Sequence, residues 1–232
     1  MAWQERTRLL LGEDATTRLQ ALRVILFGVG GVGSWCAEAL VRSGVGQLTL
    51  VDFDRIAPTN INRQLPALHS TVGELKVEVL RRRLLDINPS LQLLALPDMY
   101  EPARAETFHM ESYDYIIDAI DMLSRKADLI RRASQLPHAQ LLSAMGAARR
   151  SDPQQVRVAP FHQVRGCPLA RALRTSLKRQ QAWPLPPFRC VYSEEPPLPP
   201  SPLEPHTNGS LITVTAAFGL TLASLVINDT KR

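Results

Sequence analysis

Cysteine is scarce in this chain, and its placement excludes two common uses of that residue. The 232 residues include three cysteines, Cys36, Cys167 and Cys190, and none of them belongs to a Cys-x-x-Cys pair. One chain therefore lacks the thiolates for a tetrahedral structural zinc site. An odd number of cysteines with no secretory signal predicts a reducing compartment, the cytoplasm, rather than a disulfide-stapled secreted domain. We expect Cys36 and Cys190 to be structural residues, and a nucleophilic role is the alternative for Cys190.

A convincing membrane span is also lacking. The longest uncharged and mostly apolar stretch runs from Ser210 to Ile227, near the lower length limit for a helix that crosses a bilayer. Its threonine, serine and glycine residues make it a poor span. The stretch is predicted to be a buried helix packed on a sheet, with no integral membrane span, while association with a membrane surface stays open.

An apolar strand, a glycine-rich turn and a helix near the N-terminus predict a nucleotide site. The strand, residues 22–27, is followed by Gly28, Gly30, Gly31 and Gly33. In this fingerprint the first glycine forms a tight turn, the second lets phosphate approach the backbone, and the third lets the helix pack on the strand. The helix over 35–43 ends at Gly44, and the next strand, 47–52, ends in Asp52, where an acid binds ribose hydroxyls. A purely steric glycine turn is the alternative.

A polar loop then departs from the pattern of a dinucleotide-binding dehydrogenase. Residues 53–70 form an irregular segment that contains Arg63, and long ordered loops beside nucleotides are usually functional. Residues 71–74 match a capping box, so a helix is predicted from there to Asn88, with Lys76 in its first turns. Arg63 and Lys76 would then flank the phosphates, where cations stabilise the charge on a departing pyrophosphate. Ordinary surface cations are the alternative.

Asp121 follows a buried strand that is predicted over 113–119. Ligands of open α/β sheets bind beyond the carboxyl ends of strands, which is where Asp118 and Asp121 fall. Magnesium prefers one or two carboxylates together with phosphate oxygens and water, so Asp121 is the candidate metal ligand. The alternative is that Asp121 caps the helix predicted over 122–135.

Several ordered motifs are similar to those of the ubiquitin-activating-enzyme superfamily of adenylating enzymes. They are Gly-x-Gly-Gly-x-Gly, Asp52-Phe53-Asp54, Asn60-x-Asn62-Arg63-Gln64, Val72-Gly73-x-x-Lys76 and Ile117-Asp118-Ala119-Ile120-Asp121. Within that superfamily the chain most resembles the bacterial tRNA threonylcarbamoyladenosine dehydratases, and the resemblance covers nearly all of it. It implies that Asp52 holds the ribose of ATP, that Asn60, Arg63 and Lys76 contact its phosphates, and that Asp121 holds Mg²⁺. It also implies a homodimer in which Arg8 enters the ATP site of the other subunit.

A basic segment in an otherwise mildly acidic chain predicts a second polyanion besides ATP. From Arg149 to Arg189 there are nine Lys or Arg and one acid, a net +8 in a chain of +5, which leaves −3 for the remainder. tRNA is the partner that such a distribution favours. The candidate RNA contacts are Arg149, Arg150, Arg171, Arg174, Lys178 and Arg179. The last four lie at i, i+3, i+7 and i+8 of a helix predicted over 168–181 and so share roughly one face; a merely solvated face is the alternative.

The element order predicts a doubly wound, Rossmann-like α/β fold with a mostly parallel sheet and helices on both faces. Further strands are predicted over 91–96 and 140–143, with a helix between residues 96 and 113. We expect a single adenylating domain over 1–232, with a nucleotide-binding core at 22–146, a basic substrate-facing segment at 147–183, a proline-rich crossover at 184–205 and a C-terminal helix at 206–232. The crossover holds nine of the 18 prolines and is predicted to be extended and poorly ordered.

The function implied by the resemblance is ATP-dependent adenylation of the carboxylate of N6-threonylcarbamoyladenosine in tRNA, followed by cyclisation with loss of water. The alternatives are adenylation of the C-terminus of a ubiquitin-like or sulfur-carrier partner protein, an NAD-dependent oxidoreductase, and a nucleotide-binding scaffold without catalysis. Arg63 and Lys76 argue against the oxidoreductase, and the missing Cys-x-x-Cys pairs argue against carrier activation. The chain departs from the dehydratases at 143–153, where only one glycine precedes Asp152-Pro153, so substrate approach there is expected to differ.

Overall fold

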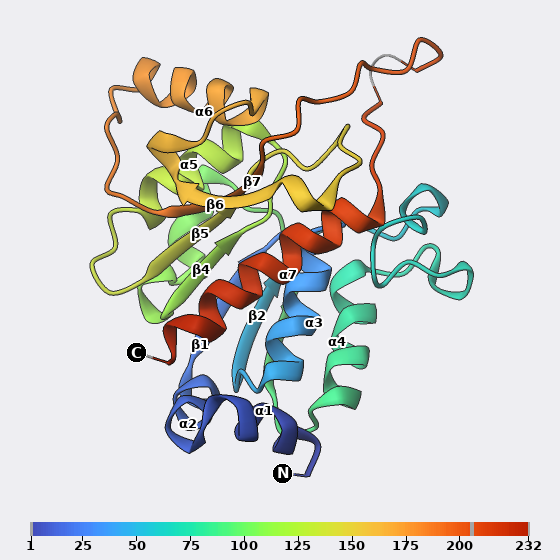
Figure 1. Cartoon of the computed structure of the whole chain (residues 1–232), viewed down its shortest axis with the longest axis vertical. Helices are drawn as coiled ribbons and strands as arrows, with labels where there is room; N and C mark the ends of the chain where they lie inside the picture. The colour runs from blue at the N-terminus through green and yellow to red at the C-terminus, as the bar shows by residue number, and fades with distance from the viewer. Residues whose placement is uncertain (1, 205–206, 232) are drawn as a thin grey trace.

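The sheet orders its strands so that most of their carboxyl ends form one edge. The computed structural model describes residues 2–204 and 207–231. Its strands are β1 (Arg23–Phe27), β2 (Gln47–Val51), β3 (Gln92–Leu96), β4 (Tyr115–Asp118), β5 (Gln140–Ala144), β6 (Val156–Pro160) and β7 (Arg189–Ser193). Their order across the sheet is β3-β2-β1-β4-β5-β7-β6, and every neighbouring pair is parallel except β6 and β7 (Figure 1). The predicted doubly wound, mostly parallel sheet is therefore confirmed.

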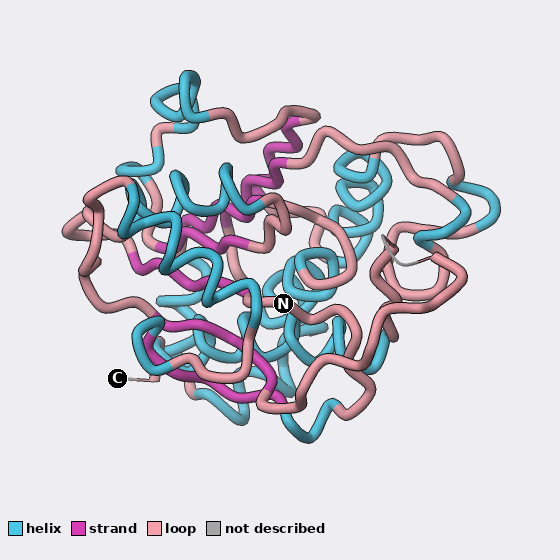
Figure 2. The backbone as a smooth tube through the Cα atoms, turned by 90° about the horizontal axis from the view of Figure 1, so that it is seen from above, coloured by secondary structure: helices cyan, strands magenta, loops and turns pink. Residues whose placement is uncertain are grey.

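Helices cover both faces of the sheet, which lies between them when seen from above (Figure 2). The α-helices are α1 (Glu5–Leu11), α2 (Glu13–Ala21), α3 (Gly33–Ser43), α4 (Lys76–Ile87), α5 (Leu123–Ala133), α6 (Pro168–Arg179) and α7 (Ile212–Asp229). Short 3-10 helices are η1 (Ala2–Gln4), η2 (Pro58–Asn60), η3 (His69–Thr71), η4 (Pro102–Phe108), η5 (Met110–Ser112), η6 (Pro153–Gln155) and η7 (Phe161–Gln163). One buried cluster joins α3, α4 and α7 to Val24 and Leu26 of β1, and the other joins α5 and α6 to Ile25 and Phe27. Successive side chains of one strand thus serve opposite faces.

Helix α4 starts later than the capping-box pattern predicts. The Thr71 hydroxyl is used inside the preceding turn, where it donates to the Pro66 carbonyl at 2.7 Å and accepts from the Leu68 amide at 2.9 Å. Leu75 is still extended, and the helix begins at Lys76. The lysine that the sequence placed in the first turns of a helix is therefore its first residue, next to the preceding loop.

The helix predicted between residues 96 and 113 is absent from the described chain, and η4 and η5 take its place. Aromatic packing anchors this segment to the sheet. The rings of Tyr100 and Phe108 meet the ring of Phe27 edge-on, with centroids 5.4 and 5.3 Å away. Two rings on one sheet residue fix short, tightly wound turns where the element order predicted a helix.

Two strands form after β5 where the sequence predicted none. β7 inserts between β5 and β6, although the proline content predicted an irregular crossover from 184 to 205. Residues 189–193 contain no proline, and Cys190 and Val191 are fully buried. Burial of this short apolar run in the sheet outweighs the proline-rich flanks. The crossover predicted over 184–205 is therefore shortened by β7. From here on, the word crossover means residues 194–204 and 207–211, which contain neither helix nor strand.

The C-terminal helix α7 packs on α3, the helix that follows the glycine loop (Figure 1). Its buried face includes Val214, Phe218 and Leu222, which confirms the predicted buried helix on that side. Gly219 permits the close approach, because a Cβ there would lie 2.3 Å from the Val32 carbonyl oxygen. Among the described residues α7 is also the one helix long and apolar enough to cross a membrane. That is weak evidence for a span, because a core helix meets the same criteria.

Gly219→Ala is expected to lower the free energy of unfolding by about 1–3 kcal/mol, the usual cost of forcing extra volume into a packed core. The added methyl group would push α7 away from the start of α3. Urea unfolding followed by circular dichroism measures the change. Leu220→Ala is the control, because Leu220 lies on the same helix and is 50% exposed. Equal stability of Gly219→Ala and the unmutated protein would contradict this close packing.

Candidate active site

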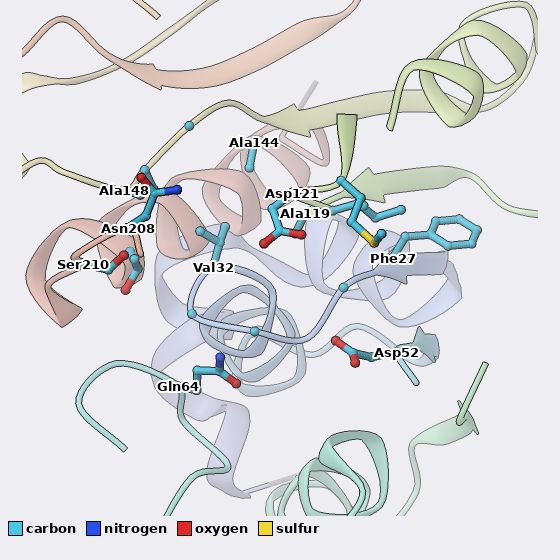
Figure 3. Close-up of a pocket in the computed structure, with 18 of the residues that line it drawn as sticks. Phe27, Val32, Asp52, Gln64, Ala119, Asp121, Ala144, Ala148, Asn208 and Ser210 are labelled. Atoms are coloured by element: carbon cyan, nitrogen blue, oxygen red, sulfur yellow. The ribbon is translucent and has the colours of Figure 1, made fainter. Parts of the chain in front are cut away.

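A cavity of about 580 Å³ opens at the carboxyl edge of the sheet. It is bordered by the ends of four strands, at Phe27, Val51, Ala119 and Ala144. The chain leaves β1 toward β2 on one side, while β4 and β5 continue on the other, and such a switch point is where open α/β sheets bind ligands. Figure 3 shows Asp52, Gln64 and Asp121 around the glycine loop at this place.

The glycine loop depends on close backbone contacts. Gly28 has φ +88°, and a Cβ there would lie 2.8 Å from the Ala119 carbonyl oxygen. A Cβ on Gly33 would lie 1.8 Å from the Gly28 carbonyl oxygen, so both positions exclude a side chain. Gly30 differs, because the nearest atom to a Cβ there is 3.7 Å away. Its missing side chain therefore matters to a ligand that approaches the start of α3, where amide groups favour anions.

Asp52 links the end of β2 to the glycine loop. Its Oδ2 accepts from the Val29 amide at 2.8 Å, and its Oδ1 accepts from the Asp54 amide at 2.9 Å. Burial raises the pKa of Asp52, while the nearby Lys76 ammonium and the two amides lower it. Each oxygen retains a lone pair, so the carboxylate can also accept from ribose hydroxyls.

The structure brings Asn60, Arg63 and Lys76 to the same cavity. Lys76 is 5% exposed, and its Nζ lies 2.6 Å from Asp54 Oδ2. Arg63 Nη1 donates to the Thr59 carbonyl and to Asn62 Oδ1, both at 2.9 Å. Asn60 Oδ1 accepts from the Ala57 amide at 3.1 Å. Lys76 therefore has a carboxylate counterion, whereas Arg63 is held by neutral oxygens.

A buried ion pair shapes the turn that carries Asp121. Asp118 and Lys126 are fully buried, with Nζ 2.7 Å from Oδ2. The Ser143 hydroxyl donates to the same carboxylate at 2.6 Å, and the Ile120 amide donates to its other oxygen at 3.1 Å. Lys126 Nζ also donates to the Ile120 carbonyl at 3.0 Å. Sequence reasoning missed Lys126, because its partner Asp118 lies eight residues away and no local pattern links the two.

Asp121 does not cap the following helix. α5 begins at Leu123, its N-cap residue is Met122, and no side chain caps it. The Asp121 side chain is exposed in the cavity and makes no hydrogen bond or ion pair with any described residue. The capping alternative is therefore wrong, and the carboxylate is free to contact a ligand.

Arg8 lies away from the cavity of its own chain. Its Nη1 pairs with Glu13 Oε1 at 3.0 Å, and both side chains are exposed. The preceding Gln4 contacts Gly44, which ends α3, whereas the glycine loop is at the start of that helix. Eleven helical residues, or roughly 16 Å at 1.5 Å per residue, separate the two ends. Any role of Arg8 at an ATP site requires a second copy of the chain.

The six predicted RNA contacts fall into three groups. Arg171, Lys178 and Arg179 are exposed on α6. Arg174 is partly buried instead, because it packs over the Phe161 ring and donates to the Phe161 carbonyl at 3.1 Å. Arg149 and Arg150 line the cavity. Arg150 is 2% exposed, so it does not belong to an exposed cationic surface.

The crossover also contributes to the cavity, which the sequence did not predict. Pro197, Asn208 and Ser210 line it. The backbone of Arg149 holds this segment. The Arg149 amide donates to the Gly209 carbonyl at 2.8 Å, and the Arg149 carbonyl accepts from the Leu198 amide at 2.7 Å. Arg149 does so with φ +58°, a conformation that favours glycine. No local pattern in a proline-rich segment indicates such a return to the site.

Cys190 behaves as the structural residue that the sequence predicted. It is fully buried in β7, and burial raises the pKa of its thiol well above the usual value. A thiol in this environment stays protonated and is a poor nucleophile. The other two cysteines are buried and unpaired as well.

Comparisons with known proteins agree with the motifs and the geometry. The family model described as "ThiF family" matches residues 4–228. The tRNA threonylcarbamoyladenosine dehydratase of Haemophilus influenzae is 35% identical over 230 residues, which cover 93% of this chain and 88% of that one. The Bacillus subtilis enzyme of the same name is 41% identical over 177 residues, covering 75% and 68%. The crystal structure of the Escherichia coli tRNA N6-threonylcarbamoyladenosine dehydratase in complex with ATP superposes with a TM-score of 0.89 at 33% identity, covering 99% of this chain and 93% of that one. The chain therefore belongs to the ThiF family, and within it resembles the tRNA threonylcarbamoyladenosine dehydratases.

Proposed function

We propose that this protein is an ATP-dependent enzyme that adenylates the carboxylate of N6-threonylcarbamoyladenosine in tRNA and closes it into a ring with loss of water. The observation that carries the proposal is that one cavity unites the glycine loop, Asp52, the cations Arg63 and Lys76, and the free carboxylate of Asp121. The Escherichia coli relative was crystallised with ATP, and it covers almost the whole chain. An enzyme with these substrates works in the cytoplasm.

ATP fits the cavity with its ribose on Asp52 and its phosphates over the glycine loop. The amides at the start of α3 would bind phosphate oxygens, and Asn60, Arg63 and Lys76 would surround the rest of the chain of phosphates. To bind a phosphate, Lys76 would leave Asp54 or contact Asp54 and the phosphate together, whereas Arg63 would give up only neutral oxygen partners. Both cations then stabilise the negative charge that grows on pyrophosphate as it leaves.

The residues at the cavity also fit Mg²⁺. Among the described residues no three His, Cys, Asp or Glu side chains are grouped so that they could hold a metal ion, so the protein alone does not form a complete metal site. Mg²⁺ in phosphate-transfer sites typically takes one or two carboxylates and completes its shell with phosphate oxygens and water. Asp121, unpaired and facing the cavity, is the carboxylate for this role. The ion would supply charge neutralisation to the phosphates.

The reaction requires positioning more than covalent chemistry by the protein. A carboxylate oxygen of the substrate attacks the α-phosphorus, the bond to the β-phosphate oxygen breaks, and pyrophosphate leaves. The substrate's own carbamoyl group then attacks the activated carbonyl carbon, AMP leaves, and the carbamoyl group releases a proton. Buried, protonated Cys190 is unsuited to an intermediate thioester, and ring closure needs none. Adenylation of a carrier protein is less well supported, because the chain lacks the paired cysteines of many such enzymes.

We propose a homodimer that completes each site with Arg8 of the other subunit. Arg8 lies too far from its own cavity to serve it, and two strongly exposed apolar side chains follow it. Leu9 and Leu10 are 76% and 81% exposed. Burial of such residues against a second copy would stabilise a dimer at about 25 cal/mol per Å² of apolar surface.

The tRNA would bind across the exposed face of α6. Arg171, Lys178 and Arg179 are exposed there, and the helix begins at Pro168, which lines the cavity. Phosphate contacts from this face would direct the modified nucleotide toward the site, while the cavity itself selects the carboxylate.

Arg63→Ala and Lys76→Ala are each expected to reduce ATP–pyrophosphate exchange, measured with tRNA that carries threonylcarbamoyladenosine, by on the order of 10² to 10³-fold. Each change removes a cation from the developing charge, and circular dichroism should show the fold intact. Arg82→Ala is the matched control, because Arg82 lies on α4 with Lys76 but pairs with Glu74 outside the cavity. Near-normal exchange in both site variants would exclude this arrangement of the phosphates.

Mixing inactive Arg8→Ala and Lys76→Ala subunits is expected to restore activity. In a mixed dimer the site with intact Lys76 receives the intact Arg8, so random mixing gives about a quarter of the unmutated rate per site. Steady-state formation of the cyclic product measures it, with each parent alone as control. If mass spectrometry shows mixed dimers and activity does not return, Arg8 does not act across the interface.

Arg171→Glu, Lys178→Glu and Arg179→Glu combined are expected to abolish tRNA binding while ATP affinity by calorimetry stays unchanged. Log affinity for tRNA should fall linearly with log salt, and loss of one cation should reduce that slope by about one. The same reversal at Arg81, Arg82 and Arg83 on α4 tests whether any cationic helix suffices. Unchanged tRNA affinity in the α6 variant would show that its cations form only a solvated face.

A further inference from the structure

Two buried side-chain polar atoms in the described chain lack a hydrogen-bond partner, and both belong to residues that line the cavity. They are Gln64 Oε1 and Arg150 Nη1. Folded proteins satisfy nearly all of their buried polar groups, so each exception needs an explanation. Because both atoms occur at one cavity, a ligand is the simplest source of the missing partners.

Arg150 has the stronger requirement, because its unpaired atom belongs to a charged group. Its Nε donates to the Gly146 carbonyl at 3.1 Å, and its Nη2 makes a long contact of 3.5 Å with the Gly166 carbonyl. These contacts hold the guanidinium between the loop after β5 and the turn before α6. Nη1 donates to no described residue and remains available to a ligand.

The charge of Arg150 also lacks a counterion in direct contact among the described residues. Across residues 2–204 and 207–231 no carboxylate lies within 4.0 Å of its guanidinium, whereas buried Lys126 pairs with Asp118. The Asp152 amide is the main group that lowers the pKa of Glu195, to which Arg150 adds only a smaller effect. A guanidinium cannot be deprotonated in a protein, and a water molecule would complete the hydrogen bond but not the charge. A buried cation of this kind calls for an anionic ligand group.

We propose that Arg150 binds the carboxylate of the substrate's threonylcarbamoyl group and determines specificity for it. This inference rests on the proposed function. The phosphates of ATP already have the glycine loop, Arg63 and Lys76. Figure 3 shows Ala148, two residues before Arg150, near Asn208 and Ser210 and across the glycine loop from Asp52. Arg150 is held to the Gly146 and Gly166 carbonyls, so it lies at the end of the cavity formed by the β5 loop, α6 and the crossover. This is the side from which tRNA bound on α6 would enter.

The geometry of a single unpaired nitrogen suits this role, because Nε and Nη2 already donate to carbonyls and only Nη1 has no partner. One hydrogen bond occupies one carboxylate oxygen and leaves the other as the nucleophile, whereas a two-pronged contact would occupy both. The positive charge also offsets the repulsion between the incoming carboxylate and the phosphates of ATP.

Arg150→Gln tests the assignment in the full-length protein. We expect kcat/KM for tRNA bearing threonylcarbamoyladenosine to fall by on the order of 10²-fold. The affinities for a non-hydrolysable ATP analogue and for tRNA lacking the threonylcarbamoyl group should stay unchanged. The unmutated protein should prefer the modified tRNA to the unmodified one, and the variant should lose that preference. Arg42→Gln, at a surface arginine of α3 outside the cavity, is the matched control.

Chemical rescue separates binding of substrate from a role in folding. Arg150→Ala removes the guanidinium, and added guanidinium ion should restore part of the turnover, whereas an equal concentration of sodium ion should not. Failure of rescue in a variant with an unchanged melting temperature would contradict direct contact with the substrate.

Other outcomes separate the inference from the proposed function. An unchanged kcat/KM in Arg150→Gln overturns the inference alone. A loss confined to the affinity for the ATP analogue would assign Arg150 to the phosphates. An equal loss of affinity for the ATP analogue, the modified tRNA and the unmodified tRNA would assign Arg150 to the fold. Either result overturns the inference. If the unmutated protein does not cyclise modified tRNA, the proposed function fails and the inference with it.

Discussion

The buried ion pair between Asp118 and Lys126 is the interaction on which the geometry of the cavity depends. It joins the end of β4 to α5, and the Ser143 hydroxyl ties it to β5. Hydrogen bonds to both charged groups offset the cost of burying them, and removal of one partner from such a pair typically costs about 3–5 kcal/mol. The turn that it stabilises presents Asp121 to the cavity. The same turn carries the Ala119 carbonyl against which Gly28 packs, so both sides of the site rest on one ion pair.

The cations around the cavity differ in how their charges are balanced without a ligand. Lys76 has Asp54, and Arg125 has Glu101 at 2.5 Å. Arg63 has only neutral oxygens, and Arg150 has two carbonyls. A cation with a carboxylate must exchange it for an incoming anion, whereas a cation without one gains a counterion outright. The four positions therefore give an anion different free energies of binding, although each carries the same formal charge.

The first half of the site could be predicted from the sequence because short segments define it. The glycine spacing, Asp52 at the end of a strand and Lys76 at the start of a helix depend on local geometry, and the sheet's carboxyl edge brings their ends together. Asp121 could be placed for the same reason.

The second half could not be predicted, because contacts between distant segments define it. β7 enters the sheet between β5 and β6, and the crossover returns to Arg149, neither of which leaves a periodic signal. The charge count of the basic segment placed Arg150, and helical spacing placed Arg174, among the candidate RNA contacts. Packing buries Arg150 and sets Arg174 on the Phe161 ring. Composition indicates how many charges a segment carries and not which of them face water.

The contact between α7 and the first turn of α3 connects the end of the chain to the phosphate-binding loop. Gly219 lies against the Val32 carbonyl, and Thr215 lies close to Gly31. A ligand that orders the glycine loop therefore also stabilises the packing of α7 on α3. Because such coupling is reciprocal, a change that loosens α7 lowers the affinity for that ligand by the same free energy. The affinity of the nucleotide site thus depends on how well the C-terminal helix α7 packs, although that helix lies far from the glycine loop along the chain.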